Sequence, residues 1–207
     1  MLSRYPLAEI FMPHSVIGLP ADLYTPRLQL RTLDSYFLSL CLRAEQEEAA
    51  DYLGCHLPPR WFAQWRLMAI KLQDLKYEPD SLPWSLRAMV HRERNEMVGQ
   101  IGFHTAPNPD YLQAHSSQGI ELGYEVYESW RRQGLAREAL QAMLGFAKRQ
   151  GVKRFVLSIS PENTASTGLA RSFGFTQFGE QWDEEDGQEY QYQLLASQLP
   201  LLDWQTD

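Results

Sequence analysis

The chain has 207 residues, of which 44% are hydrophobic and 22% are charged, and a formal net charge of −7. This length and composition predict one domain with its own core and exclude an intrinsically disordered chain. The acidic balance argues against a nucleic-acid partner, because nucleic-acid-binding proteins concentrate positive charge against phosphates. Glu9, Pro13 and His14 interrupt the N-terminal apolar residues, and no later stretch approaches transmembrane length, so we expect a cytoplasmic protein without a membrane partner.

The charges are unevenly distributed along the chain. Between residues 131 and 154, seven basic residues accompany a single acid, Glu138, which favours a small anionic ligand. Residues 178–191 hold six acids and no base, so this segment is either a solvated acidic hairpin loop or a surface that attracts a cationic substrate. Cys41 and Cys55 are too few for a disulfide framework and lack metal-ligand spacing, so we expect reduced thiols and no metal.

The first predicted elements are a strand and two helices. Apolar and polar residues alternate over Arg27–Leu33, the pattern of a half-buried strand. Asp34 is placed to cap a helix that runs to about Tyr52, and a second helix is predicted over Pro59–Tyr77. Four aromatic residues of these helices, which are core residues in most proteins, lie close together: Tyr52, Trp61, Phe62 and Trp65.

The middle of the chain predicts strands over Trp84–His91 and Met97–Thr105, joined as an antiparallel hairpin, and a further strand over Gly119–Tyr127. After Gly134, paired apolar residues form a helical stripe that stops at Gly151. A strand over residues 154–160 follows at once. A strand, a crossover helix and another strand make a right-handed βαβ unit, so the strands on either side of this helix are predicted to be parallel.

The last predicted elements begin at Asn163, which is placed to cap a short helix ending at Phe173. Gly174 follows as the left-handed residue that stops this helix. Two closing strands, at about Thr176–Gly179 and Gln188–Leu195, complete a mixed α/β sheet.

The turn before the long helix carries the clearest chemical signal. The spacing Arg131-x-x-Gly134-x-Ala136 places small residues at a helix N-terminus, where consecutive backbone N–H groups have no partner within the helix. Such a turn can bind a pyrophosphate, because the free donors and the helix dipole favour negative charge. Arg132 and Arg137 add further positive charge. On these residues alone, an ordinary strand-to-helix turn with exposed arginines is the alternative.

With these residues the chain resembles the GNAT acetyltransferases, whose signature after the fourth strand is Gln or Arg, two residues, Gly, one residue, then Gly or Ala. Arg131, Gly134 and Ala136 fit that signature. The helix after Asn163 is similar to the Asn-x-x-Ser-x-x-Leu helix that ends in Gly-Phe in this family, and residues 120–124 resemble its preceding strand. Residues 25–33, TPRLQLRTL, are similar to the first strand of the branch that contains the ribosomal-protein N-terminal acetyltransferases.

The resemblance implies a single-domain α/β fold: a mixed, mostly antiparallel sheet with a central parallel pair, strands 4 and 5, flanked by helices. It also implies acetyl-CoA as the acetyl donor, with the pantetheine arm in the gap between those two strands. The cofactor-binding residues expected from it are Val126, Tyr127, Arg131, Arg132, Gln133, Gly134, Leu135, Ala136, Arg137 and Asn163.

For catalysis, the resemblance implies a base near the acceptor nitrogen and an acid near the departing thiolate. Glu121 is the first candidate for the base, and Glu125 and Glu180 are alternatives. Many relatives carry a tyrosine acid seven residues after the capping asparagine, where this chain has Ala170. Ser166 matches the serine of the ribosomal-protein branch that contacts the cofactor sulfur, and it is the candidate to take over that role.

The expected function is acetyl transfer from acetyl-CoA to a primary amine, either a protein N-terminus or a small-molecule amine, by direct attack on the thioester. A catalytically silent CoA-binding or protein-interaction module is the alternative, because Ala170 occupies the usual acid position. The predicted organisation is an N-terminal extension over residues 1–24, the acetyltransferase domain over 25–197 and a tail over 198–207. A homodimer is left open.

Overall fold

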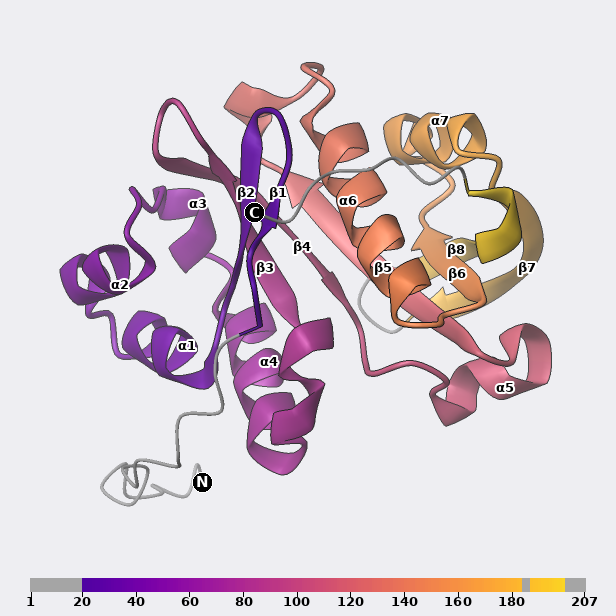
Figure 1. Cartoon of the computed structure of the whole chain (residues 1–207), viewed down its shortest axis with the longest axis horizontal. Helices are drawn as coiled ribbons and strands as arrows, with labels where there is room; N and C mark the ends of the chain where they lie inside the picture. The colour runs from indigo at the N-terminus through magenta and orange to yellow at the C-terminus, as the bar shows by residue number, and fades with distance from the viewer. Residues whose placement is uncertain (1–19, 184–186, 200–207) are drawn as a thin grey trace.

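Eight strands of the described chain form one sheet, and helices cover both of its faces (Figure 1). The computed structural model describes residues 20–183 and 187–199. The strand order is β1-β2-β3-β4-β5-β6-β8-β7, and β5 and β6 are a parallel pair among antiparallel neighbours. The strands are β1 Leu23–Tyr24, β2 Leu28–Thr32, β3 Leu86–His91, β4 Glu96–Phe103, β5 Gly119–Val126, β6 Arg154–Ile159, β7 Thr176–Asp183 and β8 Gly187–Leu195.

The helices fall into two groups along the chain. Those before β3 cover one face of the sheet, whereas α6 packs on the other (Figure 1). The α-helices are α1 Ser35–Leu42, α2 Gln46–Leu53, α3 Pro59–Phe62, α4 Trp65–Tyr77, α5 Asp110–Ser116, α6 Leu135–Arg149 and α7 Thr164–Ser172. Short 3₁₀ helices are η2 Pro79–Trp84, η3 Glu128–Trp130 and η4 Ala196–Gln198.

The predicted mixed sheet is confirmed, but the numbering of its parallel pair was wrong. The parallel strands are β5 and β6, not the fourth and fifth, because the sheet begins one strand earlier. Leu23–Tyr24 pairs with Leu30 and Gln29 of β2, inside the residues assigned to an N-terminal extension. Two residues are too few to show a strand's alternating pattern, and the side chain of Leu23 is nevertheless buried in the core.

The predicted helices before the sheet hairpin are interrupted. Asp34 caps α1 as expected, since its carboxylate accepts the Phe37 N–H at 2.8 Å, but the helix ends at Leu42 and the chain turns through Ala44 at φ 61° before α2. The predicted helix over Pro59–Tyr77 is likewise divided into α3 and α4. The next strand starts at Leu86 rather than Trp84, because η2 occupies the intervening segment.

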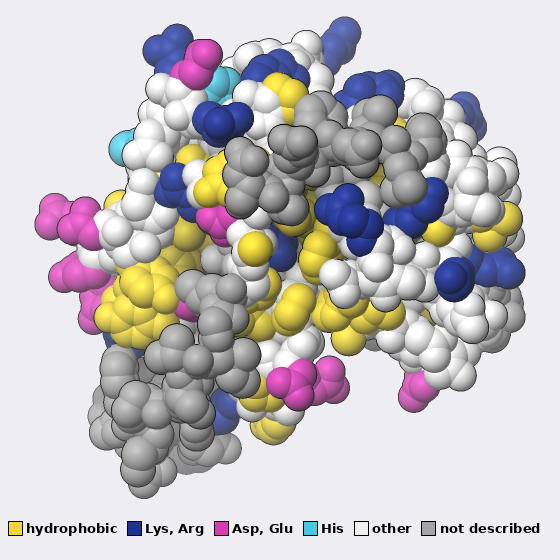
Figure 2. All heavy atoms as spheres, viewed as in Figure 1, with side chains coloured by type: hydrophobic (Ala, Val, Ile, Leu, Met, Phe, Trp, Pro, Cys, Tyr) yellow, Lys and Arg dark blue, Asp and Glu magenta, His cyan; other side chains and the backbone are white. Residues whose placement is uncertain are grey.

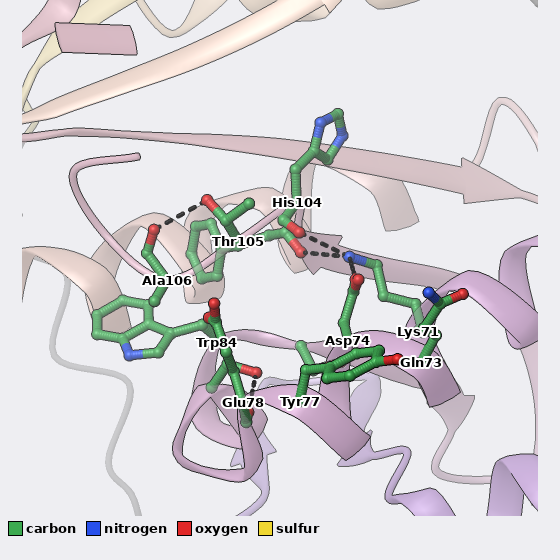
Figure 3. A pocket seen from close by; sticks show the side chains of 12 residues that line it. Lys71, Gln73, Asp74, Tyr77, Glu78, Trp84, His104, Thr105 and Ala106 are labelled. Atoms are coloured by element: carbon green, nitrogen blue, oxygen red, sulfur yellow. Dashed lines mark hydrogen bonds and ion pairs between the residues drawn. The ribbon is translucent and has the colours of Figure 1, made fainter. Parts of the chain in front are cut away.

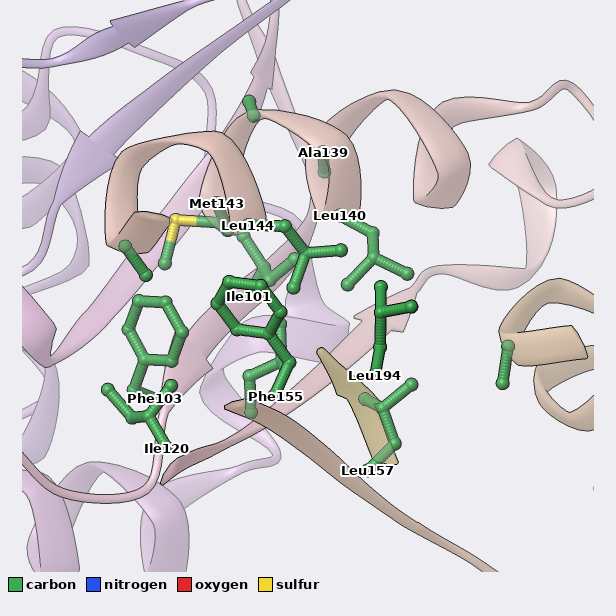
Figure 4. Packing of buried hydrophobic residues seen from close by; sticks show 14 of the residues in the cluster. Ile101, Phe103, Ile120, Ala139, Leu140, Met143, Leu144, Phe155, Leu157 and Leu194 are labelled. Atoms are coloured by element: carbon green, nitrogen blue, oxygen red, sulfur yellow. The ribbon is translucent and has the colours of Figure 1, made fainter. Parts of the chain in front are cut away.

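Two apolar cores stabilise the two faces. Ile120 of β5 and Phe155 of β6 lie with Leu140 and Met143 of α6 in the larger core (Figure 4). On the opposite face, Trp61 is fully buried, with its ring centroid 5.9 Å from that of Phe37. Trp61 is therefore a core residue, whereas Trp65 has 58% of its surface exposed.

The two free cysteines, Cys41 and Cys55, are buried in the core on the α1 side of the sheet. Burial raises the pKa of each thiol to about 11, which keeps both protonated near neutral pH. No helix among the described residues is long and apolar enough to cross a membrane. Figure 2 shows Lys and Arg side chains spread over the α6 side of the visible face, with acidic groups at the edge formed by α2.

Candidate functional site

The parallel strands β5 and β6 pair over only three residues each. Gly119, Ile120 and Glu121 face Arg154, Phe155 and Val156. Beyond that point β5 stays with β4 as far as Val126, and β6 stays with β8 as far as Ile159. The two strands therefore diverge in the middle of the sheet.

A cavity of about 310 Å³ lies where the strands diverge. It is lined by residues of both strands, of the segment from β6 to the start of α7, and of β8: Leu122, Gly123, Tyr124, Leu157, Ser158, Ile159, Ser160, Asn163, Ser166 and Glu189. The lining is mainly polar groups and exposed backbone, which suits an amide-containing chain better than a purely apolar ligand.

The backbone of β5 turns two of its residues toward this cavity. The Tyr127 N–H donates to the Val98 carbonyl at 2.9 Å, and the His104 N–H donates to the Glu121 carbonyl at 2.9 Å. In an antiparallel pair the hydrogen-bonded positions alternate, so the polar backbone groups of Tyr124 and Val126 face away from β4, toward the gap. Val126 and Tyr127 were both expected to offer backbone groups at this edge. Val126 does face the gap, but the backbone N–H of Tyr127 is bonded to β4, and the second residue that faces the gap is Tyr124.

The turn from β5 into α6 has the form expected of an anion site. Gly134 has φ 80°, the left-handed region that favours glycine, and it directly precedes the first residue of α6. The first bond of the helix joins the Glu138 N–H to the Gly134 carbonyl at 3.1 Å. The N–H groups of the preceding helical residues, Leu135 to Arg137, thus lack intrahelical acceptors.

Side chains of this turn reach in different directions. Leu135 is buried in the core, so it anchors the helix and only its backbone is available to a ligand. Arg132 is exposed at φ 62°, and Arg131 donates from Nε to the Val126 carbonyl at 3.0 Å. Arg137 donates to Ser172 Oγ of α7 at 2.7 Å. The three arginines therefore surround the α6 N-terminus, and two of them also join it to neighbouring elements.

The hairpin of β1 and β2 holds this turn in place. Arg27 donates from Nη1 to the Gln133 carbonyl at 2.8 Å, and its Nη2 forms an ion pair with Glu138 at 2.8 Å. Thr25 Oγ1 donates to the same carboxylate at 2.6 Å. Burial opposes ionisation of Glu138, but the hydrogen bonds from Thr25 and Arg27 outweigh it and lower the pKa of this carboxyl.

At the start of α7, Asn163 has the predicted capping role, because its side chain accepts the Ser166 N–H at 3.0 Å. The hydroxyl oxygen of Tyr124 is buried and forms no hydrogen bond with any described residue. Burial raises the pKa of Tyr124, and the nearby Ser166 partly offsets this without completing a well-formed bond. Ala170 is fully buried in the core and has no proton to offer.

The Glu121 carboxylate lies on the face of β5 opposite α6, and 4% of its side chain is exposed. Ser158 Oγ donates to Oε1 at 2.5 Å, and His104 Nδ1 lies 3.6 Å from Oε2. Burial, together with the charge and hydrogen bonding of Glu121, raises the pKa of the Tyr111 hydroxyl above its ordinary range. Glu121 is therefore surrounded by protein groups from β6, α5 and the end of β4.

The alternative carboxylates are placed differently. Glu125 accepts hydrogen bonds from Arg60 Nη2 at 2.8 Å and from Gln64 Nε2 at 2.8 Å, so it joins β5 to the helices on that face. Glu180 is exposed on β7, and Gln188 lies 3.4 Å away across the hairpin. Glu184, Glu185 and Asp186 of the acidic segment lie outside the described residues.

Sequence patterns gave no indication of two residues in this region, His104 and Tyr124. His104 comes from the end of β4 and meets Glu121 only through strand pairing. Tyr124 belongs to residues 120–124, which resemble a strand of the family, but no motif assigns a function to its hydroxyl. The alternation along β5 was the one available signal, since it places Tyr124 on the face of Leu122 and opposite Glu121.

Comparison with known proteins decides the family. Residues 27–176 match the family described as Acetyltransferase (GNAT) domain. The chain belongs to this family. This confirms the resemblance found in the sequence and identifies the βαβ unit and the α6 turn as parts of an acetyltransferase domain.

The chain is 26% identical over 106 residues to "Uncharacterized N-acetyltransferase YoaA" of Bacillus subtilis (strain 168). The match covers 51% of this chain and 54% of YoaA, so it spans about half the length of that curated relative.

Solved structures show the same fold. Ribosomal-protein-S5-alanine acetyltransferase from Vibrio fischeri has a TM-score of 0.58 at 14% identity, over 90% of this chain and 100% of that one. RimL, a ribosomal L7/L12 alpha-N-protein acetyltransferase in complex with coenzyme A, has a TM-score of 0.54 at 22% identity. The match covers 86% of this chain and 97% of RimL. At these identities the likeness establishes the architecture only.

Proposed function

We propose that this chain transfers the acetyl group of acetyl-CoA to a primary amine, with a protein N-terminus or a small-molecule amine as the acceptor. This proposal is supported above all by the divergence of β5 and β6 after Glu121 and Val156, which opens a polar cavity within the same βαβ unit that carries the free amides at the start of α6. The family assignment and the coenzyme A bound to RimL support the choice of donor.

The residues present fit such a donor in three places. The amide N–H groups of Gly134, Leu135 and Ala136 would donate hydrogen bonds to the pyrophosphate, with Arg131, Arg132, Gln133 and Arg137 around it. The edge of β5 at Tyr124 and Val126 offers backbone groups to the amides of the pantetheine arm. The Tyr124 hydroxyl, buried and without a partner, would gain one. An unsatisfied buried hydroxyl costs about 1–3 kcal/mol, so a ligand that pairs with it is favoured.

Acetyl-CoA supplies an activated acyl group, and the protein supplies position, charge and proton transfer. A backbone N–H of β5 facing the gap is placed to donate to the carbonyl oxygen as negative charge develops there. Tyr124 and Ser166 both line the cavity, and we assign to them the proton donation that Ala170 cannot supply. Glu121 and His104 form the basic pair on the opposite face of β5.

The acidic side chains around the proposed acceptor site favour binding of an amine that is protonated in solution. Glu121, Asp183 and Glu189 lie on the elements that surround His104 and the cavity, and their combined charge attracts an ammonium group. The amine must then lose a proton before it attacks, which is the reason for a base at this position.

Thiol release from acetyl-CoA in the presence of a broad panel of amines and N-terminal peptides tests this function. We expect turnover with at least one primary amine, and acetylation of the acceptor nitrogen in the mass spectrum of the product. Tight acetyl-CoA binding in calorimetry with no turnover on every acceptor would contradict it. That result would favour the silent CoA-binding module that the absent α7 tyrosine leaves open.

A further inference from the structure

We propose that His104 takes the proton from the acceptor amine, and that Glu121 acts through it as a positioning residue. This inference rests on the proposed acetyl transfer and assigns the base of that reaction to a residue that no sequence motif marks. It is carried by the position of the imidazole on the face of β5 opposite α6, where it lies beside the Glu121 carboxylate and over Gly123, just past the point where the strands diverge.

The imidazole lies directly over Gly123. A Cβ atom built on Gly123 would lie 3.1 Å from His104 Nε2, so the absence of a side chain there leaves the room that the ring fills. Gly123 also lines the cavity between β5 and β6. His104 Nε2 therefore stands over the strand residue beside the gap, and Nδ1 is turned toward Glu121 at 3.6 Å.

Access separates the two candidate bases. Only 4% of the Glu121 side chain is exposed, and Ser158 and His104 lie against its two oxygens. By contrast, 50% of the His104 side chain is exposed. An incoming amine can reach the imidazole without displacing protein groups, whereas it would have to displace several to reach the carboxylate.

The backbone of His104 is fixed from the other side. Lys71 of α4 is 8% exposed, and its Nζ donates to the His104 carbonyl at 2.7 Å while pairing with Asp74 at 3.1 Å. Figure 3 shows this ammonium in a pocket of about 190 Å³, with the imidazole pointing away from it toward β5. Lys71 thus anchors the main chain and leaves the ring free to face the acceptor.

The groups around the imidazole change its pKa in opposite directions. Partial burial of the ring over Gly123 lowers the pKa of His104, and the Lys71 ammonium adds to this, whereas Glu121 of β5 and Asp183 of β7 raise it. Tyr111 of α5 reaches the same carboxylate from the far side. Because the net direction is downward, His104 is uncharged near pH 7 and can accept a proton.

In the reaction, a carbon–nitrogen bond forms as the amine attacks the thioester carbonyl, and the carbon–sulfur bond breaks. The proton lost by the nitrogen goes to His104 Nε2, and the thiolate receives a proton from the hydroxyl of Tyr124 or Ser166, which then regains a proton from water. The imidazolium formed is stabilised by Glu121 and then releases its proton to water. No oxidant, reductant or metal is needed for this balance.

Three variants test the assignment. His104→Gln should lower kcat about 100-fold, leave the acetyl-CoA Kd within twofold and remove the acid limb of the kcat/KM profile. Glu121→Gln should lower kcat about tenfold and shift that limb to lower pH. Gly123→Ala should displace the ring and lower kcat, because the added methyl group would lie 3.1 Å from His104 Nε2. His56→Gln, which alters a histidine bonded through its backbone to Asn95, is the control and should keep wild-type kcat.

A measurement independent of turnover is the NMR titration of His104 in the free protein. Glu121 raises the pKa of His104, so Glu121→Gln should lower the titration midpoint. An unchanged midpoint contradicts the pairing, and a His104→Gln protein with kcat within threefold of wild type contradicts the assignment of the base. Wild-type protein that acetylates no amine contradicts the proposed function instead.

Discussion

The two sides of β5 present different kinds of site. On the α6 side, the groups that fit the cofactor are mostly backbone amides of one continuous segment, Val126 to Arg137, together with the start of α7. On the opposite side, the proposed acceptor site is built from side chains of β4, α4, α5, β5 and β6. A site made of local backbone has a short sequence signature, whereas a site assembled from distant side chains has none.

The same difference predicts how each side responds to mutation. Substitutions on the α6 side should change acetyl-CoA affinity, because they alter the shape and charge of the backbone turn. Substitutions on the His104 side should change turnover and leave that affinity intact.

The largest effect is expected from Gly134→Asp. A carboxylate at the α6 N-terminus repels the pyrophosphate, and we expect acetyl-CoA affinity in calorimetry to fall about 1,000-fold, or about 4 kcal/mol. The Cβ position lies 3.5 Å from Arg27 Nη2, an ordinary contact with a flexible group, so the fold should survive. Gly134→Asn is the matched control, because both residues tolerate the φ of 80° and only one is charged. Equal losses in the two variants would show that charge is not the cause.

Tyr124→Phe should reduce kcat about 100-fold in the thiol-release assay if this hydroxyl protonates the thiolate. Because the hydroxyl makes no hydrogen bond to the described protein, the melting temperature should be unchanged or slightly higher. Ser166→Ala separates the two hydroxyls, since a smaller loss there assigns the proton to Tyr124. Full activity in Tyr124→Phe would indicate that Ser166 protonates the thiolate instead.

Glu138→Gln should destabilise the fold by about 2 kcal/mol at pH 7, because it removes a charged acceptor shared by Thr25 and Arg27. The pKa of Glu138 is lowered from its ordinary value of 4.5, so the ionised group stabilises the fold above that pH and loses its effect as the pH falls through the folded pKa. Denaturant titrations at pH 7 and pH 3.5 should show the difference between wild type and variant shrinking in acid. A difference that grows in acid contradicts the assigned direction.

The smallest effect is expected from Glu125→Gln. This carboxylate is occupied by Arg60 and Gln64, and the ion pair is largely exposed on the arginine side, so stability should change by less than about 1 kcal/mol. Turnover should stay within threefold of wild type. If Glu125→Gln lowered kcat as much as His104→Gln, the base would be Glu125, and His104 would no longer be the better candidate.

The sequence was most informative where local backbone geometry determines the structure. Gly134 before α6 and Asn163 before α7 were both identified from residue type and spacing: Gly134 directly precedes the helix, and Asn163 makes the predicted capping bond. The parallel pair followed from the length of the crossover helix. Each of these features depends on a few neighbouring residues, so a pattern can reveal it.

What the sequence did not reveal depends on long-range packing. The break after Leu42 has no glycine or proline, and Ala44 adopts a positive φ that its residue type does not favour. His104 acquires a role only because Gly123, on another strand, has no side chain beneath it. Trp61 is buried beside Phe37 as expected for such aromatic residues, whereas Trp65, of the same group, is 58% exposed, a difference that their residue type does not predict.

A crystal structure of the protein with acetyl-CoA tests the central claim most directly. We predict that the pyrophosphate accepts hydrogen bonds from amides between Gly134 and Arg137 and that the pantetheine arm lies between β5 and β6 beyond Glu121. A coenzyme bound elsewhere, or strands that remain paired past Glu121 and Val156 with the cavity closed, would contradict it.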